Sequence, residues 1–215
     1  MIEVKTLQEA AFEQLREAII RGVYPPGQRL KQQELARSLG CSPVPVREAL
    51  HRLAAEGFVV FDPQRGAHVA DFNSRDVEQM YDIRMMLEGY AAQRAAERMT
   101  PEVARRIEAI LDKMDAPDIS PVDWVRLNSE FHDGLYACAD HEFLRKLIST
   151  LRRSMEPYLR LDVAQVGNYA AGRRDHRQIL QACVRRNGKL ASRYAIAHLR
   201  RTSQGIIKYL RTHWK

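Results

Sequence analysis

The sequence lacks several features that would assign a chain to a class directly. No apolar run approaches the roughly 20 residues that a membrane-spanning helix needs, and the N-terminus, MIEVKTLQEA, lacks the basic-then-apolar pattern of a signal peptide. Cysteine is scarce, since Cys41, Cys138 and Cys183 lie far apart and form no CxxC pair. We therefore expect a cytoplasmic protein with no membrane partner, whose cysteines are small core residues rather than disulfides or ligands.

The first third of the chain lacks an excess of either charge. The net charge of +7 would by itself indicate nucleic-acid binding. Residues 1–71, however, carry nine Lys and Arg and nine Asp and Glu, so the whole excess lies downstream. If the first part of the chain binds DNA, the placement of individual basic residues must achieve it, because its total charge does not.

The first part of the chain does contain patterns for three helices and a hairpin. Thr6 begins a capping box for a helix over 6–22, and QQELARSL predicts a second helix over about 31–39. In CSPVPVREALHRLAAEGF, Ser42 precedes a third helix that runs to about Glu56. The strand-like stretches FVVF and AHVA flank the turn DPQRG and predict a hairpin. Three helices and a hairpin indicate a winged helix-turn-helix domain.

Only helical patterns follow from about Ser74 onward. Breaks at Thr100-Pro101, Ala116-Pro117, Asp140, Gly167 and Asn187-Gly188 separate helices expected over 74–98, 100–114, 121–138, 141–163, 167–187 and 189–213. Bundles of this kind build ligand and metal sites in their cores. We therefore expect a mainly α protein, with a winged helix-turn-helix domain over residues 1–71 and an all-α antiparallel helical bundle over residues 72–215.

Four polar side chains interrupt the apolar faces of three bundle helices. Asn128 and His132 lie one turn apart beside Leu127, Phe131 and Leu135, while His176 and His198 each share a face with apolar residues of their own helix. Imidazole nitrogens suit zinc or nickel, and two ligands one helical turn apart can chelate one ion. The alternative is that the four groups are joined by waters or hydrogen bonds without a metal.

A fifth inward position carries a positive charge. Arg84 lies on one stripe with Val77 and Leu87, and a buried guanidinium needs a partner. An ion pair with Glu88, one turn on, is the structural alternative, and bidentate binding of an anionic ligand is the functional one. Tyr158, inward on the helix over 141–163, could add a hydroxyl to such a site.

The first part of the chain resembles the DNA-binding domain of the GntR family of bacterial transcription regulators. The motifs PPGxxL, ELAxxLG, PVREALxRL and RGAxV occur in the family's order. The second part is similar to the all-helical FCD domain of one branch of that family, through IRMMLEGYAA, NSEFH, DHRQIL and AHLRR. The resemblance covers nearly the whole chain. It implies a homodimer that binds a palindromic operator in double-stranded DNA and responds to a small organic acid.

The resemblance also implies DNA contacts in the second helix, the third helix and the wing. The residues at these positions are Gln33, Pro43, Val44, Arg47, Arg65, Gly66 and His68. The third helix departs from the family, because it begins Ser-Pro-Val-Pro where Ser-Arg-Thr-Pro is usual, so the common base-reading arginine is missing. Arg47 still offers a guanidinium to guanine or phosphate. The alternative is a surface ion pair of Arg47 with Glu48 or Glu56.

In the FCD domain the resemblance implies a divalent metal ion, zinc or nickel, held by Asn128, His132, His176 and His198. Asn128 stands where the domain has an acidic residue or sometimes asparagine, and a neutral amide contributes less charge. The resemblance further implies that Arg84 contacts the effector.

Three functions follow from these features. The first is a regulator, in particular a repressor, whose operator affinity depends on a small carboxylate bound at or near a metal ion. The second is a regulator that responds to the metal alone. The third is a metal-dependent hydrolase, against which the histidines form no HExxH motif and a winged helix would have no purpose. We therefore expect no enzymatic activity.

Overall fold

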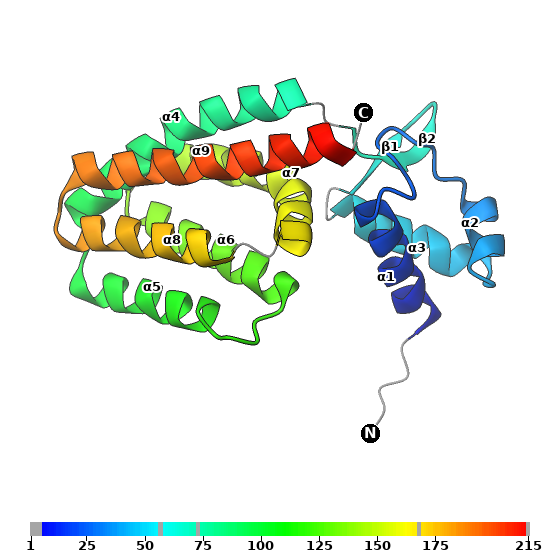
Figure 1. The fold of residues 1–215 in the computed structure, drawn as a ribbon, viewed down its shortest axis with the longest axis horizontal. Coiled ribbons are helices and arrows are strands. Elements are labelled where there is room, and N and C mark those ends of the chain that lie inside the picture. Colours follow the sequence, from blue (N-terminus) through cyan, green and yellow to red (C-terminus); the bar gives the residue numbers. More distant parts are fainter. Residues whose placement is uncertain (1–5, 56–57, 72–73, 167–168, 214–215) are drawn as a thin grey trace. The chain divides into compact units, whose positions relative to one another are not determined.

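The chain divides into two compact units. The computed structural model describes residues 6–55, 58–71, 74–166 and 169–213 (Figure 1). One unit comprises Met1–Asn73 with Leu210–Lys215, and the other comprises Ser74–Tyr209. The expected domain boundary near residue 71 stays a prediction, and the expected helix limits at Glu56 and Gly167 lie outside the described residues.

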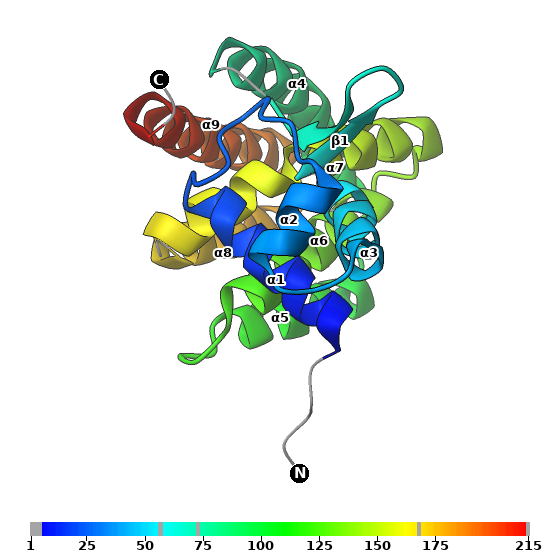
Figure 2. The ribbon, with the colours of Figure 1, turned by 90° about the vertical axis from the view of Figure 1, so that its right-hand side faces the viewer.

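The first unit contains the predicted helices α1 (Leu7–Ile20), α2 (Gln32–Ser38) and α3 (Pro43–Ala55) (Figure 2). Thr6 caps α1, because its hydroxyl accepts a hydrogen bond from the Glu9 backbone N–H at 3.2 Å. Pro43 takes the first position of α3, where a missing N–H removes no intrahelical bond. The core between α1 and α3 consists of buried apolar side chains: Phe12, Leu15, Ile19, Val46, Ala49, Leu50 and Leu53.

A two-stranded antiparallel hairpin follows α3, formed by β1 (Val59–Asp62) and β2 (Gly66–Val69). Asp62 closes the turn, since its Oδ1 accepts hydrogen bonds from the backbone N–H groups of Gln64 at 2.7 Å and Arg65 at 2.9 Å. These two bonds lower the pKa of the Asp62 carboxyl. Gly66 has φ of 77°, a conformation that side chains disfavour. The three helices and the hairpin make the predicted winged helix-turn-helix.

The second unit is the predicted helical bundle. Its helices are α4 (Ser74–Arg98), α5 (Pro101–Met114), α6 (Pro121–Ala137), α7 (Glu142–Val166), α8 (Tyr169–Val184) and α9 (Gly188–His213). Thr100 and Ser120 cap α5 and α6 through their hydroxyls, each followed by a proline at the start of its helix. Asp140, between α6 and α7, has φ of 53°, and Asn187 accepts from the Leu190 N–H at the start of α9. The breaks predicted at Thr100-Pro101, Asp140 and Asn187-Gly188 are thus present, whereas the one predicted at Gly167 lies outside the described residues.

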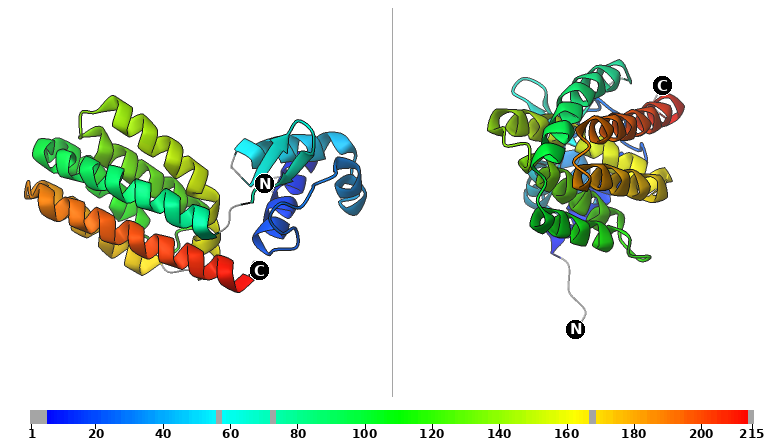
Figure 3. Two further views of the ribbon diagram at one scale, coloured as in Figure 1. Left: turned by 90° about the horizontal axis from the view of Figure 1, so that it is seen from above. Right: turned by 90° about the vertical axis from the view of Figure 1, so that its left-hand side faces the viewer.

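The long helices α4 and α9 run side by side in opposite directions (Figures 1 and 3). Gly89 permits their close approach, because a Cβ there would lie 2.9 Å from Ile196 Cδ1. Helix α6 packs against α4, α5 and α7, so its inward face lies in the middle of the bundle. Its buried Phe131 and Leu135 belong to the core. Functional side chains on α6 are therefore surrounded by protein.

Two expectations from composition can be compared with this fold. In the described part of the chain, every helix is too short or too polar to cross a membrane. Cys183 is buried in the bundle core, as predicted, whereas Cys41 and Cys138 are only partly buried. The prediction that all three cysteines are core residues is therefore correct for Cys183 and only partly so for the other two.

Candidate metal centre and DNA-binding surface

The face of α3 that does not pack in the core is exposed. Pro43, Val44 and Arg47 all lie on it, with Val44 57% exposed. Arg47 Nε lies 3.5 Å from Glu48 Oε1, so the expected surface ion pair with Glu48 is present. An exposed pair of this length contributes about 1 kcal/mol or less. It does not prevent the Arg47 guanidinium from reaching DNA.

The tip of the hairpin presents a second group of polar side chains. Arg65 is exposed, and the ring Nδ1 of His68 lies 3.2 Å from the Gly66 carbonyl oxygen. Gln33, on α2, is also exposed. A surface groove joins α2 to the hairpin, and besides Gln33 and Gly66 it is lined by Arg29, Lys31 and Arg37.

Sequence reasoning missed Arg29, Lys31 and Arg37 as neighbours of the wing. Their only sequence signal was charge, and the total charge of this domain is balanced. The backbones of Arg29 and His68 form an isolated β-bridge. This bridge places the segment before α2 beside β2. The structure thus brings Arg29, Lys31 and Arg37 beside the hairpin, together with Glu34, which forms an ion pair with Lys31 at 2.7 Å.

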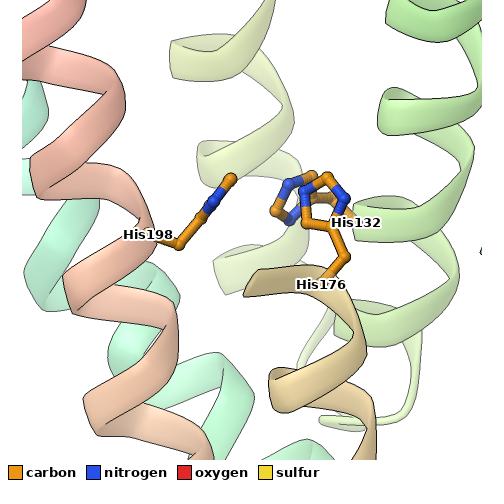
Figure 4. Close-up of side chains that lie close together, drawn as sticks. All are labelled: His132, His176 and His198. Atoms are coloured by element: carbon orange, nitrogen blue, oxygen red, sulfur yellow. The ribbon is translucent and has the colours of Figure 1, made fainter. Parts of the chain in front are cut away.

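Three histidines meet in the core of the bundle. His132 comes from α6, His176 from α8 and His198 from α9, and their rings point toward one another (Figure 4). One nitrogen from each ring can be chosen such that all three lie within 4.8 Å of one another. All three side chains are buried. Helical periodicity predicted that each of these rings faces inward, and the resemblance to the FCD domain implied that the three share one site.

The donor set fits a divalent transition metal. Three imidazole nitrogens on one zinc ion lie roughly 3.4 Å apart, given Zn–N bonds of about 2.1 Å and tetrahedral angles. The nitrogens of His132, His176 and His198, within 4.8 Å of one another, are close to that spacing. Asn128, one turn before His132 on α6, is also buried. Both side chains line one cavity of the bundle, which is described below. The amide oxygen of Asn128 is therefore available as a fourth donor or as a contact to a ligand.

The ring of His176 has no hydrogen bond within the described part of the chain. Both Nδ1 and Nε2 are buried and unpartnered, and the residue is 0% exposed. An unsatisfied buried polar group costs about 1 to 3 kcal/mol. The ring of His176 instead contacts the rings of Phe131, His198 and His132, at centroid distances of 4.5, 4.7 and 5.1 Å. A bound metal ion would satisfy one of the two nitrogens.

The other two histidines are held by partners that sequence reasoning missed. His198 Nδ1 lies 3.3 Å from Asp175 Oδ2, and Arg201 donates to the same carboxylate. His132 Nδ1 lies 3.3 Å from the Tyr136 hydroxyl. Hydrogen bonds at Nδ1 leave the Nε2 lone pair of each ring free, which is how metal-binding histidines are oriented in proteins.

The electrostatics keep two of the rings neutral. Burial lowers the pKa of His132 and His176 well below the ordinary value of 6.5; the next largest cause is Arg152 at His132 and His198 at His176. Although burial acts the other way, hydrogen bonds from His198 and Arg201 hold the pKa of Asp175 below its ordinary value. Neutral rings beside an ionised carboxylate are suited to binding a cation.

Arg84 is buried, as predicted, and it has the structural partner that the sequence allowed. Its Nε donates to Glu88 Oε1 at 2.7 Å, and Glu88 is itself 0% exposed. Burial opposes the charge of Arg84, but Glu88 raises the pKa of the guanidinium above its ordinary value. The guanidinium also lies over the ring of Tyr81, 4.5 Å from its centroid. Arg84 is thus fixed in its position and permanently charged.

A cavity of about 310 Å³ adjoins the histidines. Its walls include Arg84, Asn128, His132 and His198, so the structure brings the predicted effector-binding arginine and three of the four predicted metal ligands to one space. The walls also include Arg152 and Arg153 from α7, which sequence reasoning missed. Tyr158 is buried, as predicted, but it is not among the residues that line this cavity.

Comparison with known proteins identifies both units. Residues 7–69 match the family described as bacterial regulatory proteins, gntR family, and residues 79–201 match the FCD domain. Both matches are to DNA-binding regulators rather than enzymes.

Several relatives align with nearly the whole of this chain. The HTH-type transcriptional repressor RspR of Escherichia coli is 26% identical over 93% of this chain and 89% of its own length. An uncharacterized HTH-type regulator of Bacillus subtilis, YdhC, is 26% identical over 87% of this chain and 85% of its own. A crystal structure of a GntR family member from Pseudomonas syringae superposes with a TM-score of 0.60 at 29% identity, covering 96% of this chain and 86% of that one.

Proposed function

The chain belongs to the GntR family of transcriptional regulators with an FCD domain, and we propose that it is a repressor whose operator affinity is set by a small carboxylate bound beside a divalent metal ion. The metal ion and the carboxylate bind in the helical bundle, and the operator binds to the winged helix. The name of one relative, the transcriptional repressor RspR, supports the repressor role.

The observation that carries the metal site is the buried ring of His176, which has two unpartnered nitrogens between two oriented histidines. Zinc or nickel, held by His132, His176 and His198, satisfies one of these nitrogens. Asn128 supplies the amide oxygen as the fourth donor. When bound, the ion supplies a positive charge that attracts a carboxylate ligand.

Arg84 and the cavity beside the histidines support the carboxylate effector. The guanidinium is held by Glu88 on one side and lines the cavity on the other. The lining also includes Arg152, the exposed Arg153 and two acids, Asp133 and Glu156, so the nearly buried Arg84 and Arg152 supply the positive charge inside the cavity. A cavity of about 310 Å³ is at the lower end of the range for ligand pockets, roughly 300 to 1,000 Å³, and suits a metabolite of a few carbon atoms.

The winged helix binds double-stranded DNA through α3, α2 and the hairpin. Arg47 contacts guanine or phosphate from α3, and the apolar Pro43 and Val44 pack on the base edges beside it. Arg65 and His68 reach the minor groove or its phosphates from the wing, with Gly66 at the turn. Gln33 contacts phosphate from α2.

The regulator acts as a homodimer on a palindromic operator, because two-fold symmetric helix-turn-helix proteins read inverted half-sites. The bundle offers an apolar face for a second copy. Ile83, Met86 and Tyr90 follow one another along α4 at helical spacing and are 44%, 67% and 48% exposed. Exposed apolar stripes of this kind favour protein contacts.

Elemental analysis of the purified, untagged protein tests the metal site, with His132→Ala as the matched variant. We expect about one zinc or nickel ion per chain in the wild type and a loss of metal in the variant. Operator binding is then measured with and without small carboxylates. A response to metal in the absence of any acid would favour the simpler regulator that responds to the metal alone, and the absence of metal uptake would exclude both.

A further inference from the structure

The cavity contains a second buried cation besides Arg84. The side chain of Arg152, on α7, is only 9% exposed. Its Nη1 donates to Asp133 Oδ1 at 2.9 Å, and its Nη2 lies 3.4 Å from the main-chain oxygen of Asn128. Two bonds use only part of the five N–H groups of a guanidinium. Arg152 therefore faces the cavity with donors to spare among the described residues.

The charges of the two arginines are balanced differently. Arg84 is paired with Glu88, which is fully buried, so that pair is electrically neutral inside the protein. The partner of Arg152, Asp133, has a side chain that is 58% exposed, where water screens its charge. Arg152 therefore has the more exposed ion-pair partner of the two, and it lies on the same cavity as His132, Asn128 and the acidic Glu156.

The donor set of the proposed metal centre adds to this imbalance. Three neutral imidazoles and the neutral amide of Asn128 leave the full double charge on a divalent ion. An acidic residue in place of Asn128 would remove one of those charges. Burying uncompensated charge is unfavourable, so the complement to this site is a ligand with two negative charges.

We propose that the effector is a short dicarboxylate, with one carboxylate at the metal ion and Arg84 and the other bound bidentately by Arg152. The inference rests on the proposed function and specifies its ligand. Arg152 satisfies the second carboxylate with two parallel N–H bonds, and the exposed Asp133 turns to solvent. The methylene carbons of the ligand pack on Met155, Leu159 and Leu199, which form the apolar part of the cavity wall.

Isothermal titration calorimetry on the zinc-loaded full-length protein tests the inference with acids matched in carbon number. Succinate is compared with butyrate, and glutarate with pentanoate, while the zinc content of the same sample is measured. We expect the dissociation constant of at least one diacid to be lower than that of its matched monoacid by roughly tenfold or more. A difference of this size corresponds to one charge-assisted pair.

The outcomes separate the inference from the proposed function. Equal affinity of monoacids and diacids for the zinc-loaded protein overturns the dicarboxylate and leaves the metal-assisted regulator intact. Zinc binding with no affinity for any of these acids also overturns the dicarboxylate. Failure to hold zinc, together with failure to bind any acid, overturns both.

Two variants assign the preference to residues. Arg152→Gln should reduce diacid affinity to that of the monoacid without changing monoacid affinity, whereas Arg153→Gln, the neighbouring cavity arginine, should keep the preference. Asn128→Asp is a second test of the diacid preference, and it does not depend on whether the Arg152 variant folds. The added negative charge should weaken diacids more than monoacids while zinc is retained. An unchanged preference in Arg152→Gln or in Asn128→Asp contradicts the assignment.

Discussion

Tyr136 on α6 donates its hydroxyl proton to Glu88 on α4 across 2.8 Å, and the two residues lie 48 positions apart in the sequence. Because burial and the Glu88 carboxylate raise the pKa of Tyr136, the phenol keeps its proton. Its oxygen is then free to accept from His132 Nδ1, at 3.3 Å, which fixes the tautomer of that ring. Since Glu88 also accepts from Arg84, one carboxylate connects the proposed effector-binding arginine to a proposed metal ligand.

We expect Tyr136→Phe to weaken zinc binding by about 10- to 100-fold, the usual effect of removing the hydrogen bond that orients a metal-binding histidine. Competition with a chromogenic chelator measures the change. Tyr90→Phe is the control, because Tyr90 is a half-exposed tyrosine on α4 and should bind zinc as the wild type does. Equal zinc affinity in Tyr136→Phe and the wild type would show that Tyr136 has no part in orienting His132.

The unpartnered ring of His176 leads to a prediction about stability. Zinc at 1,000 times its dissociation constant should stabilise the wild type by about 4 kcal/mol, because the folded chain alone presents the assembled site. His176→Leu should abolish this gain. The metal-free variant should be at least as stable as the metal-free wild type, because an apolar side chain replaces a buried group that lacks hydrogen bonds.

Thermal unfolding with zinc and with EDTA, in both proteins, provides the measurement. A wild type that unfolds at the same temperature in zinc and in EDTA would contradict the prediction. So would a metal-free His176→Leu protein that is strongly destabilised, since that would mean the ring is satisfied without a metal.

The buried histidines also predict a pH dependence for the metal-free protein. The pKa values of His132 and His176 are lower in the folded chain than the ordinary value of 6.5. Below pH 6.5 the unfolded chain therefore binds protons that the folded chain does not, and stability falls as the pH falls. Each histidine contributes about 1.4 kcal/mol per pH unit over that window.

Urea unfolding in EDTA between pH 7.5 and 5 checks this slope. His176→Leu should lose about half of the dependence attributed to the two rings. Above pH 6.5, the contribution of these two rings to the free energy of unfolding of the wild type should be nearly constant. A wild type whose stability is constant from pH 6.5 to 5 would rule out the low pKa values.

For the DNA-binding domain, we expect Arg47→Ala to weaken operator binding by about 1 to 3 kcal/mol, the value of one guanidinium contact to a base. Glu48→Ala is the matched variant, because it frees Arg47 from an exposed 3.5 Å ion pair and should leave affinity unchanged or slightly higher. Fluorescence anisotropy with operator and scrambled DNA measures both. Unchanged operator affinity in Arg47→Ala would remove the residue from the interface, provided that zinc content shows an intact bundle.

The sequence predicted the fold and the residues of the site better than their partners. Thr6 caps its helix through a hydrogen bond with Glu9, three positions on, so a few neighbouring residues sufficed to predict where that helix starts. Helical periodicity likewise showed that Arg84 and the three histidines face inward. It could not show which groups meet there, because that depends on how helices far apart in the sequence are packed.

The residues that sequence reasoning missed illustrate this limit. Asp175 orients His198 from 23 positions away. Arg152 looks like a surface residue in the run LRRS, and only the packing of α7 against α6 buries its side chain beside Asn128. Glu88 was considered only as a partner for Arg84, because its second hydrogen bond, to Tyr136, crosses from α4 to α6.

The pairing of Arg84 with Glu88 decides how the effector arginine has to be tested. Arg84→Ala alone would leave Glu88 as an unpaired charge in the core, at a cost of about 3 to 5 kcal/mol.

The double variant Arg84→Gln with Glu88→Gln keeps the shape and the hydrogen-bonding capacity of the pair and removes both charges. We expect it to fold, to bind operator DNA with wild-type affinity in the absence of acids, and to lose the response to any carboxylate that affects the wild type. Operator binding in a titration with that carboxylate is the measurement. A double variant that responds at the wild-type concentration of acid would show that Arg84 is a structural residue.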